Sequence, residues 1–327
     1  MADSVSQQEP AKPDAERGER PFFSVITPVW NRAHTIRRCI DSVLSQDFDD
    51  YEIIAVDDGS EDDSLDVLRG YTDSRVKVVA LEANGGPCLA RHVGTQAARG
   101  KWFLYLDSDW VYAPGALGKF HKATGMVGPR VGYIGMMATT ETGQMCPSSP
   151  LPEGEFGFEE WAAWAGRSAV SDFLVCHRRE IYETLQWPTD RRLEGQFVLR
   201  MAWAWRGFMV HEVVGTMFTN APNRICSDRS PRAMRRALLA AEVQSQMFTE
   251  MIDEFGERLQ EHGLLYYRHL LRQCATQCFL AGHRAAGMRY AVRLLRHAPL
   301  SPKLWGTIVP GLMGPKALLT FRRWMGR

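Results

Sequence analysis

Two carboxylates one residue apart follow a short apolar stretch of this sequence. Residues 102–106 (WFLYL) form a continuous apolar run of strand length, which Asp107, Ser108 and Asp109 end abruptly. Such a run is typical of a strand buried on both faces, so the carboxylates stand at a strand's carboxyl end. In an open α/β sheet ligands bind at this edge, and paired carboxylates suit a hard divalent cation that also grips a diphosphate. A merely solvated Asp-x-Asp turn is the competing interpretation.

The preceding residues predict further strands that alternate with helices. The predicted strands are 22–27, 51–56, 76–81 and 102–106, and the predicted helices are 35–46, 62–68 and 88–98. Alternating strands and helices imply a parallel sheet with right-handed crossovers. We therefore expect an α/β fold with a Rossmann-like, mostly parallel sheet flanked by helices, and a C-terminal helical extension.

The composition is that of an ordinary soluble protein. The chain has 327 residues, 45% apolar and 24% charged, and a formal net charge of +1, which gives no bias toward nucleic acid. Its seven cysteines are scattered without a CxxC motif, which favours reduced thiols and a cytoplasmic location. The first twenty residues lack the apolar segment of a signal peptide and are expected to form a disordered leader.

Polar or turn-forming residues end the first two predicted strands as well. Residues 30–32 (WNR) follow the first strand and residues 57–60 (DDGS) the second. The carboxyl ends of parallel strands share one edge of a sheet, so these residues should converge with the Asp-x-Asp pair on a single crevice. Neither GxGxxG nor GxxxxGK[ST] follows the first strand, so hydride transfer and P-loop chemistry are poorly supported.

Four motifs in this order carry a resemblance: SVITPVWNR, YEIIAVDDGSEDDS, NGGPCLARHVG and GKWFLYLDSDW. Together they resemble the nucleotide-diphosphosugar half of family 2 glycosyltransferases, which have the GT-A fold. The resemblance covers about residues 22–112 and continues more weakly to about 216. It implies an inverting enzyme that moves a sugar from a nucleoside-diphosphate sugar to an acceptor hydroxyl.

The resemblance also predicts a domain organisation. After the leader 1–20, a GT-A domain would occupy 21–228, and a helical C-terminal region with a basic tail would occupy 229–327. Within the GT-A domain, 21–112 would bind the nucleotide sugar and 113–228 would hold the acceptor and the catalytic base.

The family assigns donor-binding roles to residues at the strand ends. Asp58 would hydrogen-bond the nucleotide base, while Pro28, Trp30 and Asn31 would line the nucleoside pocket. Arg91, on the helix after the glycine turn, matches an arginine that the family places near the base and phosphates. An ordinary surface arginine is the alternative for Arg91.

Asp107 and Asp109 match the family's DxD motif. Asp109 would bind a Mg²⁺ or Mn²⁺ ion that bridges the donor's two phosphates, Asp107 would lie near the ribose or the metal, and Ser108 would contact the donor. Where the family often has another acid, this chain has Trp110, which leaves the remaining metal ligand open. His211, on a later apolar strand, is available for that role, although a structural histidine is the commoner case.

Glu194 is the candidate catalytic base. It precedes a helix with apolar residues at helical spacing and resembles the second acid of the family's Glu-Asp pair, which is followed six residues later by Arg. Leu193 replaces the first acid. A helix N-terminus favours an ionised carboxylate, as a base requires. A simple first-turn acid is the alternative.

Other residues of the second half are less specific. Trp161 and Trp164 are able to stack on an acceptor sugar ring, although core packing is the simpler interpretation. Asp172 and Arg178 lie in the acceptor region without a definite role. Arg224, in a segment that resembles the family's closing loop, would contact the diphosphate.

The last fifth of the chain is basic and helical. From His262 to Arg327 there are eleven Lys and Arg residues and no Asp or Glu. Helices are expected over 233–255, 264–281 and 283–297. Within 300–327, apolar residues at helical spacing predict one apolar face with basic flanks that suits peripheral contact with an anionic membrane, and a docked terminal helix is the alternative. The residues of this face are Leu304, Trp305, Ile308, Val309, Leu312 and Met313.

Several functional alternatives remain open at this stage. The preferred acceptor is a saccharide or a glycolipid, and a polyprenyl phosphate is a second option. A non-catalytic nucleotide-sugar-binding protein is a third, since Leu193 and Trp110 depart from the family pattern. The tail allows a cytoplasmic protein that is peripheral on the inner face of the membrane.

Overall fold

A computed structural model describes residues 20–167, 173–219, 231–300 and 302–324. The strands are β1 (Phe23–Val29), β2 (Tyr51–Asp57), β3 (Val76–Ala80), β4 (Trp102–Tyr105), β5 (Trp110–Tyr112), β6 (Val131–Thr140), β7 (Met145–Cys146), β8 (Gly154–Phe156), β9 (Leu174–Arg178) and β10 (Arg206–Met217). The helices are α1 (Ile36–Leu44), α2 (Ser64–Arg69), α3 (Pro87–Ala97), α4 (Ala116–Thr124), α5 (Phe158–Ala165), α6 (Ile181–Thr184), α7 (Glu194–Ala204), α8 (Pro231–His262), α9 (Leu264–Leu280), α10 (Arg284–Leu295), α11 (Pro302–Met313) and α12 (Pro315–Trp324), with a 3₁₀ turn η2 (Arg191–Leu193).

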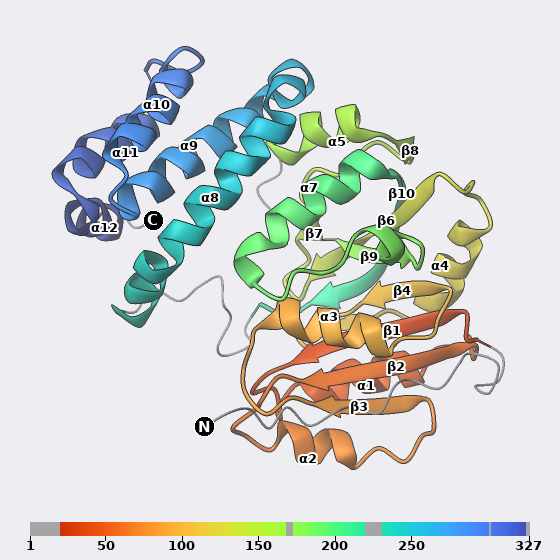
Figure 1. The fold of residues 1–327 in the computed structure, drawn as a ribbon. Coiled ribbons are helices and arrows are strands. Elements are labelled where there is room, and N and C mark those ends of the chain that lie inside the picture. The colour runs from red at the N-terminus through yellow and green to blue at the C-terminus, as the bar shows by residue number, and fades with distance from the viewer. Residues whose placement is uncertain (1–19, 168–172, 220–230, 301, 325–327) are drawn as a thin grey trace.

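The strands form one mixed sheet in the order β3-β2-β1-β4-β9-β6-β10-β5, with β7 beside β6 and β8 beside β10. The pairings β3-β2-β1-β4 and β6-β10 are parallel, and β9 runs against both β4 and β6. Six of the eight strands in that order therefore point the same way, which confirms the predicted mostly parallel sheet. Helices flank this sheet, and α8 to α12 gather at one end of the molecule beside α5 and α7 (Figure 1).

The predicted alternation of strands and helices in the first hundred residues is confirmed, with one difference at Pro28. The sequence predicted that Pro28 ends the first strand, but β1 continues to Val29. A proline cannot donate a ladder hydrogen bond. Pairing of β1 with β4 stops at Ile26, opposite Tyr105. Pro28 lies beyond that point, so its missing N–H costs no hydrogen bond to β4.

The apolar run of β4 packs into two different hydrophobic cores. Phe103 and Tyr105 belong to the core on one face of the sheet, and Trp102 and Leu104 belong to the core on the other. Successive strand residues point to opposite faces, so a strand covered on both sides needs apolar residues at every position. The two covered faces explain why this run is continuous and why polarity begins where the strand ends, at Asp107.

The C-terminal helices pack on the sheet part of the chain through α7. Gln196 Nε2 donates to Glu250 Oε2 at 2.9 Å, and Arg200 Nη2 lies 2.9 Å from Glu254 Oε2. One hydrophobic core also runs from the sheet through α5 and α7 into α8 to α12. Helix α7 is therefore held between the sheet and the C-terminal helices.

Packing divides the predicted apolar face of the tail into a buried part and an exposed part. Leu304 and Ile308 are buried where α11 packs against α9 and α10, whereas Trp305 and Val309 are 47% and 55% exposed. Gly314 separates α11 from α12, with a φ of 116°. None of the helices in the described parts of the chain is both long and apolar enough to span a membrane.

Replacing Gly59 should destabilise the fold through a backbone clash. Gly59 follows β2 with a φ of +64°, and a Cβ there would lie 2.6 Å from the Ala83 carbonyl carbon. We expect Gly59→Ala to lower the free energy of unfolding by about 2 kcal/mol or more in urea titrations. Gly143→Ala is the control, since Gly143 has a φ of +82° with nothing within 4 Å. It should lose only about 1 kcal/mol, and equal losses would rule out the clash.

Candidate active site

A cavity of about 740 Å³ lies at the carboxyl ends of β1, β2 and β4 and extends to α5, α7 and α9. Eight of the residues that the sequence predicted for the donor, metal and base sites line it, and Asn31 does not. Those on its wall are Pro28, Trp30, Asp58, Arg91, Asp107, Ser108, Asp109 and Glu194. The expected convergence of the strand ends on one crevice is therefore present.

Asp58 stands at the end of β2, where both of its carboxylate oxygens accept backbone hydrogen bonds. Gly85 N–H donates to Oδ1 at 2.8 Å and Gly86 N–H donates to Oδ2 at 2.7 Å. Burial raises the pKa of Asp58, while these two donors oppose the rise. Asp58 thus fixes the glycine turn that precedes α3, and each oxygen keeps a second lone pair for a ligand N–H.

Asn31 faces away from the cavity because its backbone is left-handed, with a φ of 52°. Its side-chain Oδ1 accepts the Glu61 N–H at 2.8 Å, and its own N–H donates to Ser60 Oγ at 3.0 Å. Ser60 N–H donates to Asp57 Oδ2 at 3.1 Å. These contacts join the ends of β1 and β2, and they give Asp57 and Ser60 turn-forming roles.

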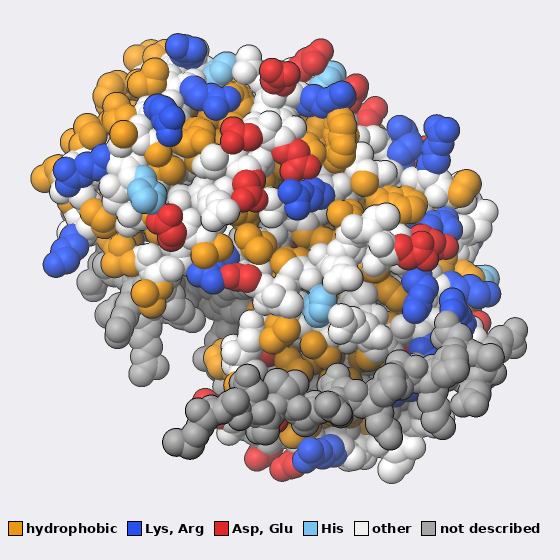
Figure 2. All heavy atoms as spheres, viewed as in Figure 1, with side chains coloured by type: hydrophobic (Ala, Val, Ile, Leu, Met, Phe, Trp, Pro, Cys, Tyr) orange, Lys and Arg blue, Asp and Glu red, His pale blue; other side chains and the backbone are white. Residues whose placement is uncertain are grey.

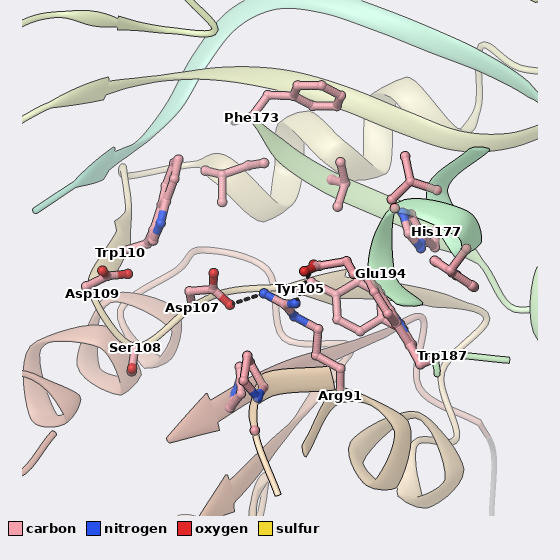
Figure 3. Close-up of a pocket in the computed structure, with 18 of the residues that line it drawn as sticks. Arg91, Tyr105, Asp107, Ser108, Asp109, Trp110, Phe173, His177, Trp187 and Glu194 are labelled. Carbon is pink, nitrogen blue, oxygen red and sulfur yellow. Dashed lines mark hydrogen bonds and ion pairs between the residues drawn. The ribbon is translucent and has the colours of Figure 1, made fainter. Parts of the chain in front are cut away.

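The Asp-Ser-Asp segment is a tight turn between β4 and β5. The Trp110 N–H donates to the Asp107 carbonyl at 2.9 Å, and the Phe218 N–H donates to the Asp109 carbonyl at 2.9 Å. Just before the turn, the Leu106 N–H donates to the Ile26 carbonyl of β1 at 3.0 Å. The backbone therefore holds Asp107 and Asp109 on the cavity wall, with Trp110 beside them (Figure 3).

Arg91, from α3, joins the two halves of the cavity by ion pairs. Its Nη2 lies 2.8 Å from Asp107 Oδ1 and its Nη1 lies 3.0 Å from Glu194 Oε1, as Figure 3 shows. The Arg91 side chain is only 13% exposed. Burial lowers the pKa of the guanidinium, but the charges of Asp107 and Glu194 outweigh it, so the pKa of Arg91 is raised. This arginine is a cationic bridge, not a surface residue.

Glu194 is the first residue of α7, as the sequence predicted. Its side chain is 39% exposed and contacts Arg91 on the cavity wall. The α7 N-terminus and the guanidinium both present positive charge to this carboxylate. Arg200, six residues later, points to Glu254 of α8 instead of the cavity.

An aromatic wall that the sequence analysis missed faces Arg91. Arg91 Cζ lies 5.3 Å from the centroid of the Trp187 ring. Trp187 in turn stacks on Phe197, with ring centroids 4.3 Å apart. Tyr105 O–H donates to Tyr182 at 2.7 Å, and Tyr182 contacts His177 Nδ1 at 2.6 Å. No motif marks these residues, since they come from separate segments and look like core aromatics.

Trp161 and Trp164 have a double role at the far end of the cavity. Both line it, yet they are only 6% and 8% exposed and belong to the hydrophobic core. Tyr266 of α9 packs edge-on against Trp161, with ring centroids 5.3 Å apart. The core-packing interpretation of these tryptophans is confirmed, and stacking on an acceptor sugar stays a prediction.

Some predicted residues do not reach the site. His211 Nε2 contacts the Leu151 carbonyl at 2.7 Å, and Arg178 Nε donates to the Val131 carbonyl at 2.9 Å; neither lines the cavity. His211 is thus not placed to complete a metal site. Asp172 and Arg224 lie outside the described residues.

The two carboxylates of the DxD turn suit a divalent cation whose remaining ligands would come from a bound substrate. Within the described ranges, no group of three His, Cys, Asp or Glu side chains is arranged to hold an ion. Magnesium is usually bound by one or two carboxylates together with substrate phosphates. Asp109 and Asp107 on the cavity wall match that donor set, with phosphate oxygens as the missing ligands.

The sequence of this chain is similar to those of known glycosyltransferases. Residues 24–131 match the family described as Glycosyl transferase family 2. The predicted class is confirmed there: this part of the chain is a family 2 glycosyltransferase domain. Succinoglycan biosynthesis protein ExoO of Rhizobium meliloti (strain 1021) is 35% identical over 111 residues, which cover 34% of this chain. The match spans only about a third of that relative, 32% of its length.

Two solved structures share the fold over nearly the whole chain. S. aureus TarS 1–349 in complex with UDP-GlcNAc has a TM-score of 0.59 and 17% identity, covering 93% of this chain and 92% of that one. Mannosyltransferase PcManGT from Pyrobaculum calidifontis, in complex with GDP-Man and Mn²⁺, has a TM-score of 0.52 and 19% identity, covering 95% and 89%. These likenesses confirm the predicted GT-A fold.

Acid should destabilise the protein through His177. Burial, with a smaller effect of Arg91, lowers the pKa of this histidine from 6.5 to about 3. Between these two values the unfolded chain binds a proton that the folded chain excludes, so stability falls as pH falls. Going from pH 7 to pH 5 should cost about 2 kcal/mol from this group.

Urea titrations at both pH values test this expectation. The decrease in the free energy of unfolding between pH 7 and pH 5 should be about 2 kcal/mol smaller in His177→Gln than in the unmodified protein. Tyr182→Phe is the control, because it removes the hydrogen bond to His177 at 2.6 Å but keeps the imidazole. An unchanged loss in His177→Gln would contradict the assignment.

Proposed function

We propose that this protein is an inverting glycosyltransferase that moves a sugar from a nucleoside-diphosphate sugar to an acceptor hydroxyl. One observation carries the proposal: Asp58, Asp109 and Glu194 line the same cavity, although three separate segments supply them. These are the groups expected to contact the nucleotide, the diphosphate and the acceptor.

The donor would lie along the carboxyl edge of the sheet. Asp58 offers carboxylate lone pairs to a base N–H, and Trp30 offers an apolar face to the base or ribose. Asp58, Trp30 and Asp109 line one continuous cavity. The nucleotide sugars named with the structures of similar fold, UDP-GlcNAc and GDP-Man, support a donor of this class.

Arg91 and Asp109 would act on the diphosphate. The guanidinium already lies between two carboxylates in the cavity, where it would offset negative charge as the nucleoside diphosphate departs. A Mg²⁺ or Mn²⁺ ion held by Asp109, with Asp107 nearby, would supply further charge stabilisation to the leaving group. The Mn²⁺ named with PcManGT supports that choice of ion.

Glu194 would act as the general base. Its carboxylate takes the proton from the acceptor hydroxyl, whose oxygen then bonds to the anomeric carbon of the donor sugar. The bond between that carbon and the phosphate oxygen breaks, and its electron pair leaves with the nucleoside diphosphate. A single displacement of this kind inverts the anomeric carbon and needs no covalent intermediate.

The acceptor would occupy the aromatic end of the cavity, beyond Glu194. Trp161, Trp164 and Tyr266 line this end, and aromatic faces suit the apolar faces of a sugar ring. A saccharide or a lipid-linked saccharide therefore fits best. The name of the relative involved in succinoglycan biosynthesis supports a role in polysaccharide synthesis.

Removing the base should abolish transfer but keep donor binding. Glu194→Gln should lower the turnover of a nucleotide sugar by about 100-fold or more, while calorimetry still detects the nucleoside diphosphate. Glu254→Gln is the matched control, because it breaks an exposed ion pair with Arg200 outside the cavity. An active Glu194→Gln enzyme would refute the base. Donor binding without turnover in the unmodified protein would favour a non-catalytic binding protein.

Removing the second carboxylate of the DxD turn should abolish stimulation by the cation. We expect Asp109→Asn to lose the dependence of hydrolysis on Mn²⁺ concentration, since the ion loses its main protein ligand. Asp66→Asn, on exposed α2, controls for the loss of one charge. Equal Mn²⁺ stimulation in Asp109→Asn and the unmodified protein would remove Asp109 from the metal site.

A further inference from the structure

Helix α11 carries an apolar surface that nothing in the described chain covers. Trp305, Val309, Leu312 and Met313 are 47%, 55%, 44% and 73% exposed. Their spacing of four, three and one residues puts them on one side of the helix. Leu300, just before the helix, is 90% exposed. We call these five side chains the α11 face.

The α11 face is separate from the side that fixes the helix. Leu304 and Ile308, 0% and 4% exposed, pack toward α9 and α10, so the helix is already docked without the α11 face. Trp305 is oriented by a hydrogen bond from its Nε1 to the Pro299 carbonyl at 3.0 Å. Adjacent exposed apolar side chains with polar residues around them mark interaction surfaces.

The helices from α9 onward, which include the α11 face, carry only basic charges of their own, and Glu242 of α8 pairs with His283 at the start of α10 at 2.8 Å. No Asp or Glu occurs between residues 263 and 327, and Arg296 and Lys316 are exposed on either side of α11. Figure 2 shows orange and blue side chains over the α10 and α11 end of the molecule. A partner that is apolar at its centre and negatively charged around it would therefore complement this surface.

We propose that the α11 face docks on an anionic lipid membrane. A helix lying in the interface buries apolar side chains at the depth of the headgroups, while basic residues at its margins meet anionic lipid. Tryptophan is favoured at that depth because its ring is apolar and its N–H is polar. A second copy of this chain fits less well, since a symmetric contact would bring the exposed Arg296 and Lys316 of both copies together. This inference concerns the surface and does not depend on the proposed activity.

Vesicle co-sedimentation of the full chain tests the proposal. The protein should pellet with vesicles of phosphatidylcholine mixed with phosphatidylglycerol, and much less with phosphatidylcholine alone or at high salt. Trp305→Glu should lower the partition coefficient about tenfold or more. Lys316→Gln should lower it about fivefold, since one basic residue near the surface is lost.

Leu239→Glu is the matched control, because Leu239 is 71% exposed on α8 and lies outside the α11 face. It inserts the same charge and should leave binding unchanged. Circular dichroism checks that each variant folds, and Val309→Glu replaces Trp305→Glu if the latter does not. Equal losses in Trp305→Glu and Leu239→Glu, or no binding to anionic vesicles, would overturn the proposal. A dimer in light scattering that Trp305→Glu dissociates, without vesicle binding, would make this face a contact between copies.

Discussion

The buried guanidinium of Arg91 needs carboxylates beside it, and that need joins three distant segments of the chain. A charge removed from water is costly unless it is paired and hydrogen-bonded. Asp107 and Glu194, 16 and 103 residues away in sequence, supply the pairing at 2.8 and 3.0 Å. The end of β4 and the start of α7 are thereby both held beside α3.

Other residues that line the cavity lie around this ion-paired arginine. At the end of β2, Asp58 holds the glycine turn before α3 by backbone hydrogen bonds, so it also sets the start of the helix that carries Arg91. On the other side, Trp187 and Phe197 stack beneath the guanidinium and exclude water from it. Four carboxylates, Asp58, Asp107, Asp109 and Glu194, line the cavity together with two arginines, Arg32 and Arg91. The cavity wall therefore carries a surplus of negative charge.

The sequence predicted the parts of the site that follow from a parallel sheet. Strands of one direction end at one edge, so Asp58 and Asp109 had to meet there. The sequence did not predict the contacts set by tertiary packing. Asn31 was expected in the nucleoside pocket, but its left-handed backbone turns the side chain to Glu61. Tyr105 belongs to a strand buried on both faces, and periodicity does not say which face borders a cavity.

The same limit appears in α11. Helical spacing groups Leu304, Trp305, Ile308 and Val309 on one broad apolar face, but only the position of α9 decides which half of it is buried. Which residues remain exposed is a property of the packed helices, not of the pattern.

The C-terminal helices take part in the cavity instead of forming a separate appendage. Gly166 after α5 and Gly263 before α9 allow a close backbone approach: a Cβ at Gly166 would lie 2.5 Å from the Tyr266 nitrogen, and one at Gly263 would lie 2.7 Å from the Ala162 carbonyl oxygen. That approach brings the Tyr266 ring onto the cavity wall beside Trp161. The predicted domain boundary near residue 228 therefore does not separate the residues of the cavity, because Tyr266, from beyond that boundary, completes its aromatic end.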